Sequence, residues 1–184
     1  MRQFELHPPV VLTAGNHDLP DPVTAEGLKR YRSIFGDDFQ TMDCKGKYLI
    51  SANSQLWREA PQSEQDSHRR KLHESLELAK RKGQPVVMVT HIPPFVTFID
   101  EPDEYFNLPV SLRSDLLMQC EKNGVFVWLA GHIHRTVQRT SGAITVLNGE
   151  TTSRNFDERP AGFRLLTVYP DNRFEWEFVA LAQD

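Results

Sequence analysis

Cysteine is scarce in this chain of 184 residues, and both a long apolar run and a stretch of basic charge are missing. Cys44 and Cys120, the only two cysteines, lie far apart without a C-x-x-C spacing, so reduced thiols are favoured over a disulfide. No apolar stretch approaches the ~20 residues of a membrane span, and residues 1–20 lack the pattern of a signal peptide. These absences predict a soluble, cytoplasmic protein with no membrane partner; a leader lost upstream is the alternative.

The charge of the chain is modest. Its 21 Lys and Arg residues stand against 25 Asp and Glu residues, which gives a net charge of −4, and no basic residues are interleaved with aromatic ones. This balance argues against nucleic acid as an obligatory partner. The length is that of one domain with a core of its own, so we interpret residues 1–184 as a single domain.

Apolar periodicity predicts an alternation of strands and helices. Helices are expected at about 24–35, 63–82 and 109–122, and strands at 10–13, 48–53, 86–90, 125–129, 144–148, 162–169 and 173–180. The inward stripes of the three helices would consist of Leu28, Tyr31 and Phe35, then Leu72, Leu76 and Ala79, then Leu112, Leu116, Leu117 and Cys120. This order of elements suits an α/β sandwich with the helices outside.

Polar side chains follow three of the predicted strands. The first of these strands ends in Gly15-Asn16-His17-Asp18, the strand at 86–90 ends in His91, and the strand at 125–129 ends in Gly131-His132-Ile133-His134. Each motif alone has a plain explanation as a polar turn. Ligands of open α/β sheets bind outside the carboxyl ends of the strands, however, and three such motifs in one sequence predict a common site there. Imidazole nitrogens and amide oxygens suit Mn, Fe or Zn as ligands.

These motifs, in this order, resemble those of the calcineurin-like metallophosphoesterases. The segments 35–39 (Phe-Gly-Asp-Asp-Phe), 53–55 (Asn-Ser-Gln) and 104–108 (Glu-Tyr-Phe-Asn-Leu) narrow the resemblance to one branch of that family. The resemblance implies an α/β fold, a β-sandwich flanked by helices. It also implies hydrolysis of phosphate esters at a binuclear centre of two divalent metal ions, with a phosphoprotein or a small phosphoester as substrate.

The resemblance also implies a role for each site residue. Asn16, His91 and His132 would bind one ion, and His134 the other. His17 would contact the phosphoryl group and stabilise the transition state or protonate the leaving oxygen, while Asp18 fixes the tautomer and orientation of His17.

Two upstream motifs of that family have no counterpart here. The family pattern begins with D-x-H and G-D, which supply the other ligands, and only 14 residues precede Gly15. Asp66-Ser67-His68 spells D-x-H, but it lies in a predicted helix, where residues two apart point about 200° away from each other. Gly36-Asp37 spells G-D but follows the histidine motif at 15–18 rather than preceding it.

We therefore expect a family domain that lacks its first strands, binds at most one ion weakly and has compromised activity. A non-catalytic interaction module and a phosphodiesterase of the same superfamily are the alternatives.

Four other residues are interpreted as having no part in the predicted site. Arg154 is favoured as a surface arginine over a phosphate ligand, His7 as a residue of the entry loop, and His68 and His73 as water-facing residues of the second helix.

Overall fold

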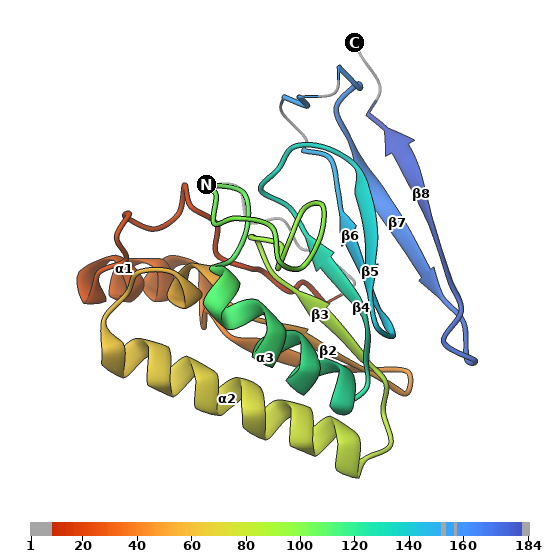
Figure 1. The fold of residues 1–184 in the computed structure, drawn as a ribbon, viewed down its shortest axis with the longest axis horizontal. Coiled ribbons are helices and arrows are strands. Elements are labelled where there is room, and N and C mark those ends of the chain that lie inside the picture. The colour runs from red at the N-terminus through yellow and green to blue at the C-terminus, as the bar shows by residue number, and fades with distance from the viewer. Residues whose placement is uncertain (1–8, 152–153, 157, 182–184) are drawn as a thin grey trace.

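A computed structural model describes residues 9–151, 154–156 and 158–181 of the chain. In order, the elements are α1 (Ala25–Phe35), β1 (Gln40–Cys44), β2 (Lys47–Ser51), the 3-10 helix η1 (Ser54–Trp57), α2 (Gln62–Arg81), β3 (Val86–Val89), α3 (Val110–Lys122), β4 (Val125–Ala130), β5 (Val137–Ser141), β6 (Ile144–Asn148), β7 (Gly162–Val168) and β8 (Phe174–Ala180). Figure 1 shows the helices on one side of a sheet and the β7–β8 hairpin on the other.

The main sheet has six strands in the order β1-β2-β3-β4-β6-β5. Its four inner strands run parallel, and β1 and β5 are antiparallel edges. Parallel pairing brings the carboxyl ends of β2, β3 and β4 to the same edge of the sheet. The chain leaves these three strands toward Asn53, His91 and Gly131, so this edge carries the polar residues that the sequence singled out.

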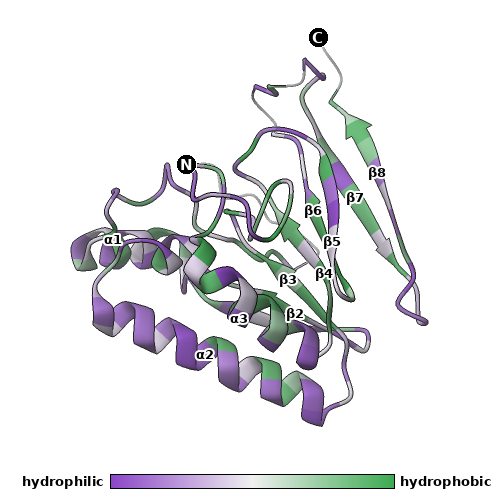
Figure 2. Ribbon diagram, viewed as in Figure 1, coloured by the Kyte–Doolittle hydropathy of each residue, from purple (hydrophilic) through white to green (hydrophobic). Residues whose placement is uncertain are grey.

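Helices α2 and α3 cover one face of the main sheet. Leu72, Leu76 and Ala79 form the buried stripe of α2, as predicted, and the opposite side of the helix is hydrophilic (Figure 2). They meet sheet residues such as Ile50, Met88 and Trp128 in the largest apolar cluster, to which α3 adds Leu116, Leu117 and Cys120. Each fully buried aliphatic side chain of this size contributes about 1.5–3 kcal/mol, so this layer fixes the sheet under the site.

The β7–β8 hairpin packs on the other face. Val87, Val127 and Leu147 of the main sheet contact Leu166, Phe174 and Trp176 of the hairpin. A buried carboxylate also joins the two sheets, because Glu150 pairs with Arg164 of β7 and with Arg159 at 2.7 Å. The result is two sheets face to face with helices outside, which confirms the predicted α/β fold class.

A smaller apolar cluster joins α1 to the segment that precedes it. Leu28 and Tyr31 are buried against Ala14, Leu19, Val23 and Leu56. Thr24 begins the helix by accepting a hydrogen bond from the Gly27 N–H. Phe35 was predicted to face inward as well, but it is 43 % exposed. It is the last residue of α1, outside the buried cluster, and its ring contacts that of Tyr31.

The strand predicted at 10–13 is wrong. Val10 and Leu12 are exposed, and the segment has no regular secondary structure. It lies along the end of β2 through side-chain contacts, Thr13 Oγ1 to the Ala52 carbonyl and Ser51 Oγ to the Leu12 carbonyl. Since β2 already has β1 and β3 as neighbours, no backbone edge is left there for another strand.

The polar edge strands β1 and β5 were not predicted.

Candidate functional site

Three of the predicted metal ligands meet at the carboxyl edge of the sheet. His91 Nε2 lies 2.7 Å from Asn16 Oδ1 and 3.1 Å from His132 Nδ1. The rings of His91 and His132 have centroids 4.8 Å apart. These side chains come from three different strand ends or turns, 41 and 75 residues apart in sequence. The predicted convergence of Asn16, His91 and His132 is therefore present.

The hydrogen bonds define which atoms of this group carry lone pairs. His132 Nε2 lies 2.9 Å from the Tyr105 carbonyl, which can only accept, so Nε2 carries the proton and Nδ1 of the neutral ring has the lone pair. His91 Nε2 then donates toward the Asn16 oxygen and His132 Nδ1, two acceptors. The proton on His91 Nε2 thus lies between Asn16 Oδ1 and His132 Nδ1. A metal ion that replaced this proton would contact the lone pairs of all three atoms.

Both rings are held neutral. Burial lowers the pKa of His91 to about 4, with further lowering by His132, His17 and His134. Burial likewise lowers the pKa of His132, although its hydrogen bond to the Tyr105 carbonyl works in the opposite direction. At neutral pH both imidazoles are therefore uncharged, which is the form that binds metal ions.

Local backbone geometry brings the ligands together. The Gly131 N–H donates to the His91 carbonyl at 3.0 Å, which continues the pairing of β3 with β4 beyond the sheet. His132 then adopts a left-handed conformation with φ 68°, which turns the chain sharply. On the other side, a Cβ on Gly15 would come within 3.1 Å of two His91 ring atoms, so the missing side chain lets the turn at 15–18 approach the imidazole.

The remaining predicted residues lie around this group. His134 Nδ1 contacts the Arg154 carbonyl at 2.9 Å, which leaves the lone pair of its neutral ring on Nε2, and its ring stacks on Phe156. His17 is exposed, and its proximity contributes to the lowered pKa of both His91 and His132. Asp18 accepts from the Gly15 N–H at 2.8 Å, so its role in orienting His17 stays a prediction.

Sequence reasoning missed Tyr105, which contacts two of the three converging residues. Its phenol oxygen lies 2.8 Å from Asn16 Nδ2, and its carbonyl accepts from His132 Nε2. The hydrogen bond to the phenol oxygen turns Asn16 Nδ2 toward Tyr105, so that Asn16 Oδ1 points toward His91. Partners of this kind orient ligands and fix tautomers in metal sites. The segment at 104–108 carried the narrower family resemblance, and this was the signal available.

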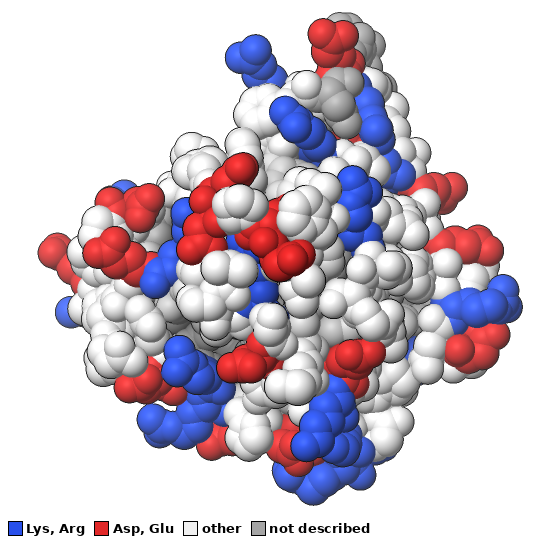
Figure 3. Space-filling view, in the orientation of Figure 1, with Lys and Arg blue, Asp and Glu red and all other residues white. Residues whose placement is uncertain are grey.

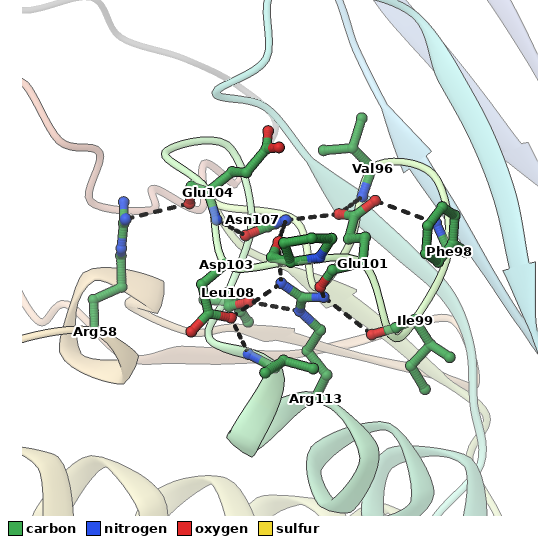
Figure 4. A network of polar contacts seen from close by, with 12 residues as sticks. Arg58, Val96, Phe98, Ile99, Glu101, Asp103, Glu104, Asn107, Leu108 and Arg113 are labelled. Carbon is green, nitrogen blue, oxygen red and sulfur yellow. Dashed lines mark hydrogen bonds and ion pairs between the residues drawn. The ribbon is translucent and has the colours of Figure 1, made fainter.

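A buried polar network holds the loop that carries Tyr105 (Figure 4). The guanidinium of Arg113, wholly buried in α3, donates to the carbonyls of Leu108, Ile99 and Glu101. The Glu101 carboxylate accepts from the backbone of residues 96–98 and from Asn107 Nδ2. A loop without regular structure is thereby fixed from its interior, and Tyr105 is presented to the site in one position.

His68 is a second buried histidine, contrary to its predicted exposure, whereas His73 is exposed as predicted. His68 Nε2 accepts from the Asn53 N–H at 3.0 Å, and its ring packs edge-on against Phe39 and Trp57. Burial lowers its pKa to about 4. The helical spacing of charged neighbours suggested a water-facing side, but the loop after β2 folds over this position.

His7 lies outside the described residues, and Arg154 is exposed as predicted.

The donor set fits one divalent ion better than two. Within the described ranges, no group of three or more His, Cys, Asp and Glu side chains has metal-binding geometry. The converging group instead combines two imidazoles with an amide oxygen, all neutral. These atom types suit Mn, Fe or Zn, but no carboxylate there offsets the charge of a cation. The residues present could therefore hold one ion through three neutral donors.

The model of the calcineurin-like phosphoesterase family matches residues 1–136. Since this match spans well over half of the chain, the protein belongs to that family, whose members use divalent metal ions. The predicted family is thereby confirmed.

The relatives narrow this assignment. The chain is 32 % identical over 172 residues to the serine/threonine-protein phosphatase CPPED1 of Bos taurus, covering 91 % of this chain and 55 % of the relative. It is 30 % identical over 164 residues to the same protein of Homo sapiens, covering 87 % and 52 %. The branch suggested by the three shorter segments, calcineurin-like phosphoesterase domain-containing protein 1, is therefore supported. The chain spans about half the length of the curated relatives it matches.

A solved structure supports the fold independently. GAP50, described as the anchor in the inner membrane complex of Plasmodium, superimposes with a TM-score of 0.55 at 14 % identity, covering 77 % of this chain and 49 % of that one. At this identity the likeness concerns the fold alone.

In the described part of the present chain, none of the helices has the length and apolar character needed to cross a bilayer.

Proposed function

We propose that this protein is a metal-dependent phosphoesterase whose metal half-site consists of Asn16, His91 and His132. The observation that carries the proposal is the 2.7 Å and 3.1 Å approach of Asn16 and His132 to one nitrogen of His91. Polar residues of a solvated turn have no reason to converge in this way from the ends of β3 and β4 and from a third, separate turn. Family membership supplies the reaction class, hydrolysis of phosphate esters.

Each residue has a role in this proposal. Divalent ions supply Lewis acidity and a nucleophile at neutral pH when they are bound. Asn16 Oδ1, His91 Nε2 and His132 Nδ1 would hold one ion, and His134 would contribute to the second in a version that carries the other ligands. His17 contacts the phosphoryl group and passes a proton to the leaving oxygen. Tyr105 keeps the Asn16 amide and the His132 tautomer in the binding form.

The substrate is proposed to be a phosphomonoester on serine or threonine. The support is the name of the relatives, which are serine/threonine-protein phosphatases. A cytoplasmic location is proposed with it, on the composition of the sequence. A phosphodiesterase would differ in its preference between p-nitrophenyl phosphate and bis(p-nitrophenyl) phosphate, with the diester turned over faster.

The test combines metal content with hydrolysis. The 184-residue chain should bind one Mn²⁺ or Zn²⁺ weakly and hydrolyse p-nitrophenyl phosphate very slowly, whereas a version that carries the D-x-H and G-D motifs upstream should bind two ions and be active. A stable fold that binds no ion in either version would instead identify a non-catalytic module and refute the proposal.

A further inference from the structure

A cleft of about 350 Å³ lies beside the candidate site, and none of the proposed metal ligands lines it. One wall belongs to the loop between β3 and α3, and the other to the turn at 131–136 and the start of β5. The volume falls within the range of about 300–1,000 Å³ that is usual for ligand pockets. The apolar lining consists of Val96, Phe98, Pro102, Phe106, Ile133 and Val137.

The cleft and the metal half-site share one turn and one ring. The ring of Phe106, which lines the cleft, has its centroid 5.6 Å from that of His132. Along the turn, Ile133 and Arg135 line the cleft and alternate with the two histidines of the site. A substrate whose phosphoryl group lies over the half-site therefore has the cleft beside it, on the far side of Phe106.

Phe98 gives the cleft an apolar surface that a partner can reach, because its side chain is 52 % exposed. The loop beneath it is fixed, since the backbone N–H groups of residues 96–98 all donate to the Glu101 carboxylate (Figure 4). A surface that is fixed beforehand avoids the entropy cost of ordering a loop on binding. Aromatic side chains in this setting are typical contact residues for a protein or peptide partner.

The charges of the cleft favour a peptide over a polyanion. Arg135 is exposed on one wall, and its guanidinium has no hydrogen bond or ion pair with the described residues. Acidic side chains gather over the opposite wall (Figure 3), where Asp100, Asp103 and Glu104 are exposed. These carboxylates would repel a nucleotide. A peptide main chain, by contrast, has a carbonyl that can accept from Arg135 and an N–H that can donate to Glu104.

We infer that this cleft is a docking site for a large apolar side chain of the polypeptide that carries the phosphate, with Phe98 as its aromatic contact and Arg135 as the donor to the neighbouring main-chain carbonyl. The inference rests on the proposed phosphoesterase function and narrows its substrate class to phosphoproteins with apolar residues close to the phosphorylated one. Lysine or arginine further along the substrate would meet the acidic wall favourably.

The first experiment measures binding without hydrolysis. Acetyl-Lys-Leu-Leu-Ser-Leu-Leu-Lys-amide, the same peptide with alanine for leucine, and adenosine are each added to the ¹⁵N-labelled 184-residue chain. Only the leucine peptide should shift the backbone signals of residues 96–98 and 135. Its Kd should rise roughly 10-fold or more in Phe98→Ala, the scale of a lost apolar contact in a pocket. Phe163→Ala, at a 48 % exposed ring of β7, is the matched control and should bind like the wild type. Equal shifts with the alanine peptide or with adenosine would overturn the docking site.

The second experiment measures specificity in the version that hydrolyses, with phosphoserine in place of the central serine of both peptides. The wild type should have a kcat/KM roughly 10-fold or more higher for the leucine peptide than for the alanine peptide, and Phe98→Ala should lose this preference. Phe163→Ala should retain it. Because the two peptides are compared on one protein, differences in metal content or folded fraction cancel. Equal kcat/KM for both peptides in the wild type would contradict the inference.

The contribution of Arg135 is tested by a second ratio. In Arg135→Met, kcat/KM for the leucine phosphopeptide relative to that for p-nitrophenyl phosphate should fall roughly 3- to 10-fold, the effect of one lost hydrogen bond. Arg139→Met, at an exposed arginine of β5, is the matched control and should keep the ratio. An unchanged ratio in Arg135→Met would contradict its contact with the main chain. A chain that hydrolyses neither phosphopeptide but binds the leucine peptide through Phe98 would refute the phosphoesterase function while supporting the docking site.

Discussion

His91, which is partly buried, and His68, which is buried, have the same lowered pKa and different surroundings. Burial lowers the pKa of each to about 4. His68 Nε2 faces a backbone N–H, a donor that uses its lone pair completely. His91 Nε2 faces an amide oxygen and a second imidazole nitrogen, two acceptors that a cation could share. Both histidines thus have a lowered pKa. A hydrogen-bond donor beside the ring nitrogen identifies His68 as structural, whereas acceptors beside the ring nitrogen make His91 a candidate metal ligand.

The largest expected effect separates a histidine of the converging group from a surface histidine by metal binding. His132→Ala removes one of the three converging donors, so metal affinity should fall by more than the 10- to 100-fold that loss of a supporting contact causes. Activity should be lost with it in a version that hydrolyses. His73→Ala, on the surface of α2, is the control. Equal metal affinity in both variants, measured by calorimetry, would remove the distinction.

The next effect concerns stability against pH and is tested at His68, which is not one of the candidate metal ligands. The unfolded state takes up its proton near the ordinary histidine pKa of 6.5, and the native state only near about 4. Stability from this group is therefore fully present above pH 6.5 and falls as the pH drops toward 4, by about 3 kcal/mol in total. Denaturant unfolding of His68→Gln should show a shallower fall than the wild type, and exposed His73→Gln should not.

A third effect separates binding from chemistry within the site. In a version that hydrolyses, His17→Ala should lower kcat by about 100-fold, the scale of a lost acid or electrostatic donor. It should retain its metal, because His17 is not among the converging atoms. Metal analysis beside the kinetics decides this. Loss of metal in His17→Ala would make His17 a ligand and merge the two roles.

The smallest effect tests the support given by Tyr105. Tyr105→Phe removes the phenol that contacts Asn16 Nδ2 and keeps the carbonyl that accepts from His132. Loss of one hydrogen bond of this kind costs about 1 kcal/mol, so metal affinity should fall about 5-fold. Tyr169→Phe in the distant β7–β8 turn is the control. No change in affinity would show that Asn16 is oriented by other contacts.

The sequence allowed the ends of β3 and β4 and the polar residues after them to be predicted, because buried parallel strands are continuous apolar runs followed by turns. It did not reveal β5, whose Val137–Ser141 sequence is mostly polar, since an edge strand has little apolar surface to bury. The burial of His68 and the contacts of Tyr105 were also hidden. Both depend on partners far along the chain, Asn53 and the residues Asn16 and His132, which local periodicity does not report.

The most direct test of the metal half-site is the tautomer of its two histidines, read by long-range ¹H–¹⁵N NMR of the 184-residue chain with and without Zn²⁺. Without metal, both rings should carry the proton on Nε2. With metal, the proton of His91 should move to Nδ1 as Nε2 becomes a ligand, while His132 should keep its Nε2 proton on the Tyr105 carbonyl and bind through Nδ1. If Zn²⁺ at millimolar concentration leaves the signals of both rings unchanged, the convergence of Asn16, His91 and His132 is not a metal site.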